Sequence, residues 1–273
     1  YWRRIQAELS APQQQVKENV PVAAVFLFDT SASMEYRLES KTRLERAQEL
    51  SVDFLEKLPP RSRVSVADTT SDAPALFQAD LTSARSRIRA LKPSPASLPM
   101  NSRLRAALLT QEDDRRRALE QESNVPVELR QDRMTREIYI FTDMSRSAWK
   151  PEDARLLHAE MERQPWISVY LIDVGVRKPA NIGISGLRLS RQTVTEGGPI
   201  TVEATLEAVG VESAARTVEI YLNSGAGGLA KKGQSTVTVD TQGGARVAFT
   251  LPGAKGAIVQ GEVRLVASDP LAI

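Results

Sequence analysis

Oxygen-bearing side chains gather at the end of the first apolar run of this chain. Asp29 follows that run, and Ser31 and Ser33 come next at alternate positions of one short loop. One carboxylate and two hydroxyls at this spacing can turn three oxygens toward a common point. Oxygen ligands at this density suit a hard divalent cation, and compact octahedral Mg²⁺, with metal–oxygen distances of roughly 2.0–2.1 Å, suits them best. No His or Cys lies nearby to favour zinc or copper.

A second carboxylate stands at the end of another apolar run. Glu137–Thr142 is rich in β-branched and aromatic residues, and Asp143 follows it directly. In an open α/β sheet, ligands bind beyond the carboxyl ends of the strands. We therefore expect Asp143 to lie at the same edge of the sheet as Asp29. The alternative is that Ser31 and Ser33 merely cap a helix and that Asp29 sits in a turn.

The elements that must position these side chains alternate between strand and helix patterns. Continuous apolar runs predict buried parallel strands, at Val22–Phe28, Arg63–Ala67, Glu137–Thr142 and Trp166–Val174, with a short edge piece at Ala75–Phe77. Apolar residues at helical spacing predict helices at Thr42–Leu58, Leu81–Leu91 and Pro151–Arg163, and the start of another at Leu104–Leu109. The charged stretch at Gln111–Arg136 lacks a clean period and predicts an exposed helical extension plus loop. This alternation indicates a doubly wound, mostly parallel sheet that is covered on both faces.

The pattern changes after Lys178 and Pro179. From Gly183 onward, short runs of alternating apolar and polar residues are separated by glycine-rich turns. These runs predict antiparallel strands, at Ile200–Leu206, Thr217–Leu222, Thr236–Val239, Arg246–Phe249 and Gly261–Val266. Such strands predict a small all-β sandwich of the immunoglobulin-like type. We therefore divide the chain into an N-terminal juxtamembrane or linker segment at 1–20, an α/β domain at 21–179 and a β-sandwich at 180–273.

The order of these oxygen-bearing residues resembles a known family. Asp-x-Ser-x-Ser after the first strand is the signature of the metal-ion-dependent adhesion site of von Willebrand factor A domains. That family adds a Thr within Gly-Thr-x-Leu-x-x-Ala-Leu, and the sequence Asn-Ser-Arg-Leu-Arg-Ala-Ala-Leu at 101–108 places Ser102 at the Thr position. The family then has an Asp within Thr-Asp-Gly, and Asp143 matches it, with Met144 at the position of the Gly.

The resemblance implies a binding module rather than an enzyme. In the family, five protein positions direct oxygens at a Mg²⁺, Mn²⁺ or Ca²⁺ ion, and a partner protein fills the open position with a Glu or Asp carboxylate. Carried onto this chain, Asp29, Ser31 and Ser33 hold the ion, Ser102 supplies a hydroxyl, and Asp143 acts directly or through water. The Ser and the Met that depart from the family pattern leave open a scaffold whose metal site is vestigial.

Two further segments are similar to bacterial aerotolerance-type (Bat-like) proteins. These are the stretch at 138–149 and the opening of the second domain at 182–189. In those proteins a pair of transmembrane helices precedes the A domain, and the order Tyr1-Trp2-Arg3-Arg4 is the aromatic and basic flank found where such a helix leaves the lipid. This resemblance implies a membrane-anchored bacterial protein whose soluble part is extracytoplasmic.

Composition removes several other classes of function. The 273 residues contain no Cys, which excludes disulfide scaffolds, zinc fingers and cysteine nucleophiles. A net charge of +2 gives no indication of nucleic acid binding. A Ser/His/Asp triad would have to use His158, the single histidine, which lies within a predicted helix. A Mg²⁺-dependent phosphohydrolase with Asp29 as nucleophile is a further alternative, but such enzymes need a second Asp at the position of Ser31.

Overall fold

The chain folds into two compact units, at 1–176 and 177–272. The computed structural model describes residues 3–6, 20–73, 76–78, 80–122, 124–190, 198–223, 228–240, 244–252 and 260–266, and residues 3–6 only as a strand.

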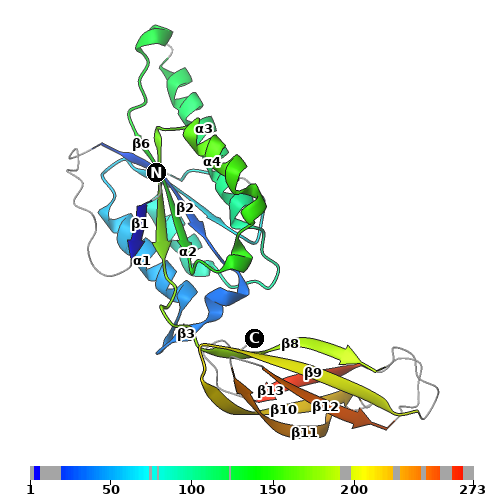
Figure 1. Cartoon of the computed structure of the whole chain (residues 1–273). Helices are drawn as coiled ribbons and strands as arrows, with labels where there is room; N and C mark the ends of the chain where they lie inside the picture. The colour runs from blue at the N-terminus through cyan, green and yellow to red at the C-terminus, as the bar shows by residue number, and fades with distance from the viewer. Residues whose placement is uncertain are drawn as a thin grey trace. The chain divides into compact units, whose positions relative to one another are not determined.

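The first unit contains a five-stranded sheet in which every neighbouring pair of strands is parallel (Figure 1). Its strands follow the order β1-β7-β6-β2-β5. Their bounds are β1 Arg3–Gln6, β2 Val22–Phe28, β5 Arg63–Asp68, β6 Thr135–Thr142 and β7 Ile167–Asp173. The helices are α1 Arg43–Lys57, α2 Leu81–Ala90, α3 Met100–Gln121 and α4 Ala154–Glu162. The predicted α/β class, with a parallel sheet flanked by helices, is confirmed.

Both faces of this sheet are buried, which explains why β2 is apolar at every position. Ala24, Phe26 and Phe28 of β2 belong to a core cluster that includes residues of α1 and α2. Val25 and Leu27 belong to a second cluster that includes residues of α3 and α4. Because alternate side chains of a strand point to opposite faces, α1 and α2 cover one face and α3 and α4 cover the other.

The order of the strands reverses at the pair formed by β2 and β6. From β2 the chain passes through α1 to β5 on one side, and it later returns to β6 on the other side of β2. The connections that leave β2 and β6 therefore lead to helices on opposite faces. Such a reversal opens a crevice at the carboxyl ends of the two strands, where α/β proteins bind ligands. Asp29 and Asp143 are the residues that follow these two strands.

Several elements differ from the sequence-based expectation. Residues 3–6, which lie in the predicted N-terminal segment, form strand β1 and pair with β7. The sequence does not predict this strand, because four residues are too few to show a periodic pattern. Helix α3 begins at Met100 rather than at Leu104, directly after Pro99. Of the predicted edge piece at Ala75–Phe77, Ala75 lies outside the described residues, and a single bridge joins Gln78 to Val64.

Short elements connect the longer ones. The loop after β2 contains the 3-10 turn η1 and a two-stranded hairpin before α1. Their bounds are η1 Ala32–Glu35, β3 Arg37–Leu38 and β4 Lys41–Thr42. The other 3-10 turns are η2 Val127–Leu129, η3 Arg146–Ala148 and η4 Pro151–Asp153. Thr42 and Glu45 form a reciprocal capping box at the start of α1, so the first residue of that helix has a well-defined backbone position.

The second unit consists of two three-stranded antiparallel sheets, with strand orders β12-β9-β8 and β11-β10-β13. The bounds are β8 Asn181–Leu189, β9 Ile200–Val209, β10 Ser213–Asn223, β11 Leu229–Asp240, β12 Ala245–Leu251 and β13 Gly261–Val266. Leu206 and Phe249 of one sheet share a hydrophobic cluster with Val218 and Val239 of the other. The immunoglobulin-like classification of this unit stays a prediction.

Candidate functional site

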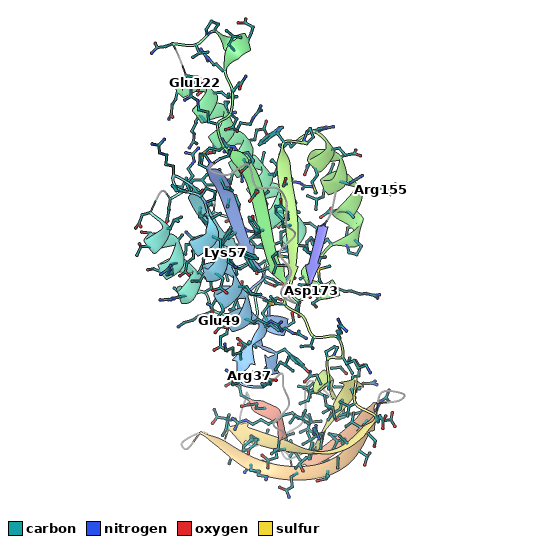
Figure 2. The ribbon with its side chains drawn as sticks, turned by 90° about the vertical axis from the view of Figure 1, so that its left-hand side faces the viewer. Arg37, Glu49, Lys57, Glu122, Arg155 and Asp173 are labelled. Atoms are coloured by element: carbon teal, nitrogen blue, oxygen red, sulfur yellow. The ribbon has the colours of Figure 1, made fainter. Side chains whose placement is uncertain are left out.

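Four strands of the first unit place an Asp at the same edge of the sheet. Asp29 follows β2, Asp143 follows β6, and Asp68 and Asp173 are the last residues of β5 and β7. Figure 2 shows Asp173 at the end of its strand. Because all four strands are parallel, these carboxylates lie along the edge where the crevice opens.

Asp29 is held rigidly at the centre of this edge. Its side chain is fully buried. One carboxylate oxygen accepts the backbone N–H of Ser31 at 2.9 Å, and the other accepts the hydroxyl of Thr142 at 2.9 Å. The backbone N–H of Asp29 donates to the carbonyl of Phe141 on β6, also at 2.9 Å. The loop that follows β2 is therefore joined to the end of β6 through Asp29.

The two serine hydroxyls converge beside Asp29. The Oγ atoms of Ser31 and Ser33 lie 3.1 Å apart. Two adjacent oxygen ligands of an octahedral Mg²⁺, each at 2.0–2.1 Å from the ion, are about 2.9 Å apart, so this spacing fits a shared cation. Ser31 occupies the N-cap position of η1, but its side chain makes no capping hydrogen bond. The capping alternative therefore does not explain Ser31.

Ser102 lies in the first turn of α3 and is exposed. Its hydroxyl donates to the carbonyl of Pro99 at 2.7 Å, and within the described residues no hydrogen bond joins it to the Asp29 loop. As an acceptor, the hydroxyl oxygen still has a free lone pair. Asn101, at the family's Gly position, is buried and makes two hydrogen bonds to the backbone of Lys150, of 2.7 and 3.2 Å. These bonds join the start of α3 to the connection that follows β6.

The segment before α3 is bound to the Asp29 loop by hydrogen bonds through Thr30. The carbonyl of Thr30 accepts the N–H of Ser94 at 2.7 Å. The hydroxyls of Thr30 and Thr69 lie 2.7 Å apart, and the carbonyl of Thr69 accepts the N–H of Leu98 at 2.7 Å. The chain segment that carries Ser102 thus starts next to the loop that carries Ser31 and Ser33.

Asp143 is bound by an arginine. One of its carboxylate oxygens accepts the N–H of Ser145 at 3.0 Å. The other accepts Nη1 of Arg43, the first residue of α1, at 2.5 Å, and the two side chains are only 2% and 9% exposed. Arg43 is not among the residues that the sequence predicts for this site. Its place at the start of a helix could have indicated an acidic partner, since a cation in the first turn is unfavourable next to the helix dipole unless an anion faces it.

The turn after Asp143 contains a strained residue, Met144, and Gly175 from another segment packs tightly against this turn. Met144, which replaces the family's Gly, has a φ of 61°, and left-handed backbone favours glycine. Gly175, after β7, packs against this turn so closely that a Cβ atom there would lie 2.9 Å from the carbonyl oxygen of Asp143. The position of Asp143 therefore depends on both residues.

Met144→Gly is expected to raise the free energy of unfolding by about 1 kcal/mol, because it relieves the left-handed strain of a residue with a side chain. The Met144 side chain is 41% exposed, so little packing is lost. Urea denaturation followed by tryptophan fluorescence measures this, since Trp149 and Trp166 lie in the first unit and the sequence of the second unit contains no tryptophan. Met144→Ala is the matched control and should gain nothing. A destabilised glycine variant would contradict the strain argument.

The donor set is that of a hard cation. Among the residues that the structure describes, no three His, Cys, Asp or Glu side chains form a group that could hold a metal. A cation here would therefore rest on serine oxygens with two carboxylates. His158 is exposed on α4 and lies 3.3 Å from Glu162, and no hydrogen bond among the described residues joins it to a Ser or Thr hydroxyl. No described helix combines the length and the apolar character needed to cross a bilayer.

Comparison with family models found a similarity within the first unit. Residues 24–145 match the family model of the von Willebrand factor type A domain. This range contains all five side chains predicted to hold a metal. No curated protein matches the chain significantly.

Comparison with solved structures adds no information on fold or function. The GH3 β-glucosidase of Bifidobacterium adolescentis is 25% identical over 26% of this chain and 11% of its own, with a TM-score of 0.23. A β-glucosidase from Erythrobacter marinus is 10% identical over 91% and 47%, with a TM-score of 0.25. One from Listeria innocua in complex with glucose is 11% identical over 88% and 42%, with a TM-score of 0.23. This chain spans less than half the length of each, and TM-scores this low support no inference.

Proposed function

From a first unit that contains a von Willebrand factor type A domain, we propose that this chain is a cation-dependent protein–protein interaction module. Domains of this type generally mediate protein–protein interactions. The finer part of the proposal is that Asp29, Ser31 and Ser33 hold a divalent cation, Mg²⁺ first, with Ser102 and Asp143 completing the set. When bound, the ion would offer a Lewis-acid position that a Glu or Asp carboxylate of a partner can occupy.

The spacing of the two serine hydroxyls is the observation that carries this proposal. Their 3.1 Å separation fits two adjacent ligands of one small cation, and they stand beside a buried carboxylate whose two oxygens are already oriented by hydrogen bonds. A preoriented carboxylate loses little freedom when an ion binds. The proposed site also lies at the strand reversal, where α/β proteins bind ligands.

A structural scaffold with a vestigial metal site is the second candidate. It is favoured by the ion pair between Arg43 and Asp143 and by the hydrogen bond from Ser102 to Pro99, since both engage proposed ligands without a metal. No observation favours a phosphohydrolase, because Ser31 stands at the position where such an enzyme needs a second Asp.

Mg²⁺ and Mn²⁺ binding to the wild-type chain and to Asp29→Asn tests the metal part of the proposal. Asparagine is isosteric: its Oδ1 can still accept the N–H of Ser31, and its Nδ2 can donate to the hydroxyl oxygen of Thr142, which reverses the direction of that bond. The fold should therefore be preserved while cation binding is lost. Asp68→Asn is the matched control: it too ends a strand at this edge, but its carboxylate is bound by Thr70. Isothermal titration calorimetry should show binding for the wild type and the control only. Equal heats for wild type and Asp29→Asn would reject the metal site.

The partner part needs a second measurement. A protein retained by the immobilised chain in Mg²⁺, released by EDTA and not retained by Asp29→Asn would support the proposal. A partner retained equally under all three conditions would favour the scaffold candidate. The Bat-like resemblance also implies a bacterial protein with a membrane tether and an extracytoplasmic position, and we propose these properties with the function. Retention of partners from membrane extracts alone would support the membrane tether.

A further inference from the structure

The side chain of Arg43 occupies the place next to the proposed cation site. Its Nη1 donates to the carboxylate of Asp143 at 2.5 Å and to the carbonyl of Ser33 at 3.0 Å. It therefore contacts the loops that follow both β2 and β6. The guanidinium also lies 4.2 Å from the centre of the Tyr36 ring. A positive charge is thus already present within the group of residues proposed to bind a divalent cation.

This charge is buried and incompletely satisfied. The Arg43 side chain is 9% exposed, and its Nε has no hydrogen-bond partner among the described residues. A buried guanidinium with an unsatisfied N–H is stable only while its anion stays in place. Asp143 is the single carboxylate with which Arg43 forms an ion pair in the described part of the chain. A cation that withdrew the charge of Asp143 would therefore destabilise the present position of Arg43.

Arg43 changes the net charge of the proposed cation site. Asp29, Asp143 and Arg43 together carry a charge of −1, so a bound divalent cation leaves +1, and a partner's carboxylate brings the sum to zero. Without Arg43 the two carboxylates and the cation sum to zero before any partner binds. Like charges a few ångströms apart in a buried site repel strongly. Arg43 should thus weaken binding of the cation alone and favour the state in which a carboxylate is also bound.

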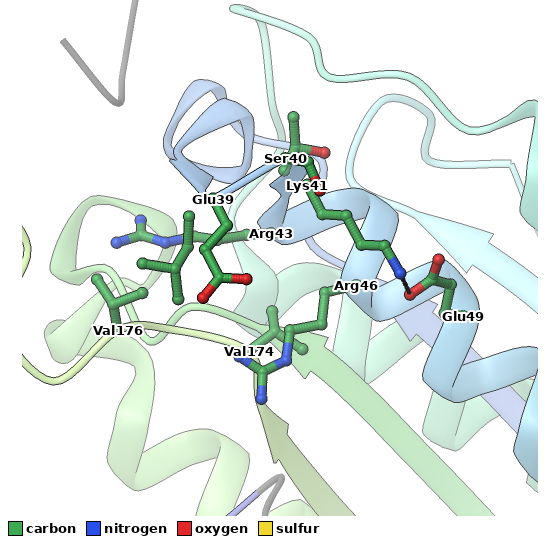
Figure 3. A pocket seen from close by; sticks show the side chains of 10 residues that line it. Glu39, Ser40, Lys41, Arg43, Arg46, Glu49, Val174 and Val176 are labelled. Carbon is green, nitrogen blue, oxygen red and sulfur yellow. Dashed lines mark hydrogen bonds and ion pairs between the residues drawn. The ribbon is translucent and has the colours of Figure 1, made fainter.

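Space for a displaced arginine is available next to it. Arg43 is one of the residues that line a pocket of about 360 Å³, together with Glu39, Arg46 and Val174 (Figure 3). Glu39 is exposed and carries a carboxylate on the wall of this pocket. The side chain can therefore leave Asp143 by rotating, while the capping box at Thr42 keeps the start of α1 fixed.

We propose that Arg43 is an internal cation that competes with the divalent metal for Asp143 and so makes metal binding conditional on an anionic partner. The inference rests on the proposed function, since it assigns a positioning residue to the same site. Competition between Arg43 and the metal also explains the ion pair between Arg43 and Asp143, which would otherwise favour a vestigial metal site. It also predicts that the affinity for Mg²⁺ alone is limited by Arg43 rather than by the serine ligands.

The test measures Mg²⁺ affinity of the chain alone by isothermal titration calorimetry for four proteins. Arg43→Gln removes the charge, Arg43→Lys keeps it, and Arg46→Gln removes a charge one turn further along α1. Arg46 lines the same pocket, and no ion pair or hydrogen bond of its side chain occurs within the described residues, so it is a matched control. We expect Arg43→Gln to bind Mg²⁺ about tenfold more tightly or better, and the other two variants to remain within about twofold of the wild type.

The outcomes separate this inference from the proposed function. Wild type and Arg43→Gln binding equally, or Arg43→Gln binding more weakly, would overturn the inference while the metal part of the proposed function holds. Binding by Arg43→Gln but not by the wild type would support the inference and show that the native chain does not bind Mg²⁺ without a partner. Absence of binding in all four proteins would reject both.

A second measurement uses only the wild-type chain and therefore does not require that any variant folds. In the wild-type chain, saturating Mg²⁺ should shift the Nε–Hε resonance of Arg43 in a ¹⁵N-correlated NMR spectrum, because the guanidinium leaves Asp143. The Arg46 resonance should move less. An unchanged Arg43 resonance at saturation would show that the two cations do not compete and would overturn the proposal.

Discussion

Asp114→Ala is expected to lower the free energy of unfolding of the first unit by about 3 kcal/mol, because it breaks a buried ion network. Asp114 lies on α3, and its Oδ2 accepts Nη2 of Arg63 at 2.6 Å and Nη1 of Arg136. The Arg136 side chain is 1% exposed, and it also contacts Asp132 at 2.7 Å. Losing Asp114 leaves two guanidinium groups without a shared anion, and Asp132 compensates for only one of them.

The neighbouring residue provides the control for this prediction. Asp113 pairs with Arg116 on the surface of the same helix, where the side chains are 49% and 62% exposed. An exposed pair contributes little, so Asp113→Ala should cost less than about 0.5 kcal/mol. Urea denaturation followed by tryptophan fluorescence compares the two variants in the first unit. Equal midpoints would show that the buried network does not stabilise the fold.

Phe141→Ala is expected to cost about 3–5 kcal/mol, since it opens a cavity in the aromatic core beneath the site. Phe141 is fully buried. Its ring stacks on Phe28 with a centroid distance of 4.7 Å and an interplanar angle of 10°, and it meets Phe26 edge to face at 5.6 Å. These contacts fix the last residues of β2 and β6, which precede Asp29 and Asp143.

Phe141→Leu separates the volume of the ring from its aromatic contacts. It keeps most of the buried apolar surface, so we expect a cost well below that of alanine, about 1–2 kcal/mol. The same urea transitions give both values. An alanine variant that loses less than about 1 kcal/mol would mean that neighbouring side chains fill the space, and that the aromatic cluster does not set the geometry of the strand ends.

The sequence predicts well those features that depend on local patterns. The apolar runs locate β2 and the last residues of β6, and the spacing in 42–58 locates α1 to within one residue at each end. Asp-x-Ser-x-Ser leads to the domain type that the family model supports at 24–145. Each of these features is carried by residues that are close together in the chain, so their periodicity or spacing is visible without the fold.

Features that depend on long-range contacts could not be predicted. The pair of Arg43 and Asp143 joins residues 100 positions apart, and no sequence spacing relates them. The left-handed backbone of Met144 arises in a turn whose neighbours come from another strand. The metal ligand set itself stays a prediction, because the structure brings Asp29, Ser31 and Ser33 together and binds Asp143 to Arg43 but leaves the hydroxyl of Ser102 on Pro99.

The close packing of Gly175 against Asp143 has a consequence for how relatives of this chain can diverge. Any side chain at this position would meet the carbonyl of Asp143 and the carboxylate of Asp173, each at 2.9 Å. Relatives that keep the strand-terminal Asp in its present place should therefore keep glycine at 175, although this residue contributes no ligand. Loss of that glycine would mark lineages in which the turn after β6 has changed shape, so this one position can help to sort relatives with an intact site from those that have abandoned it.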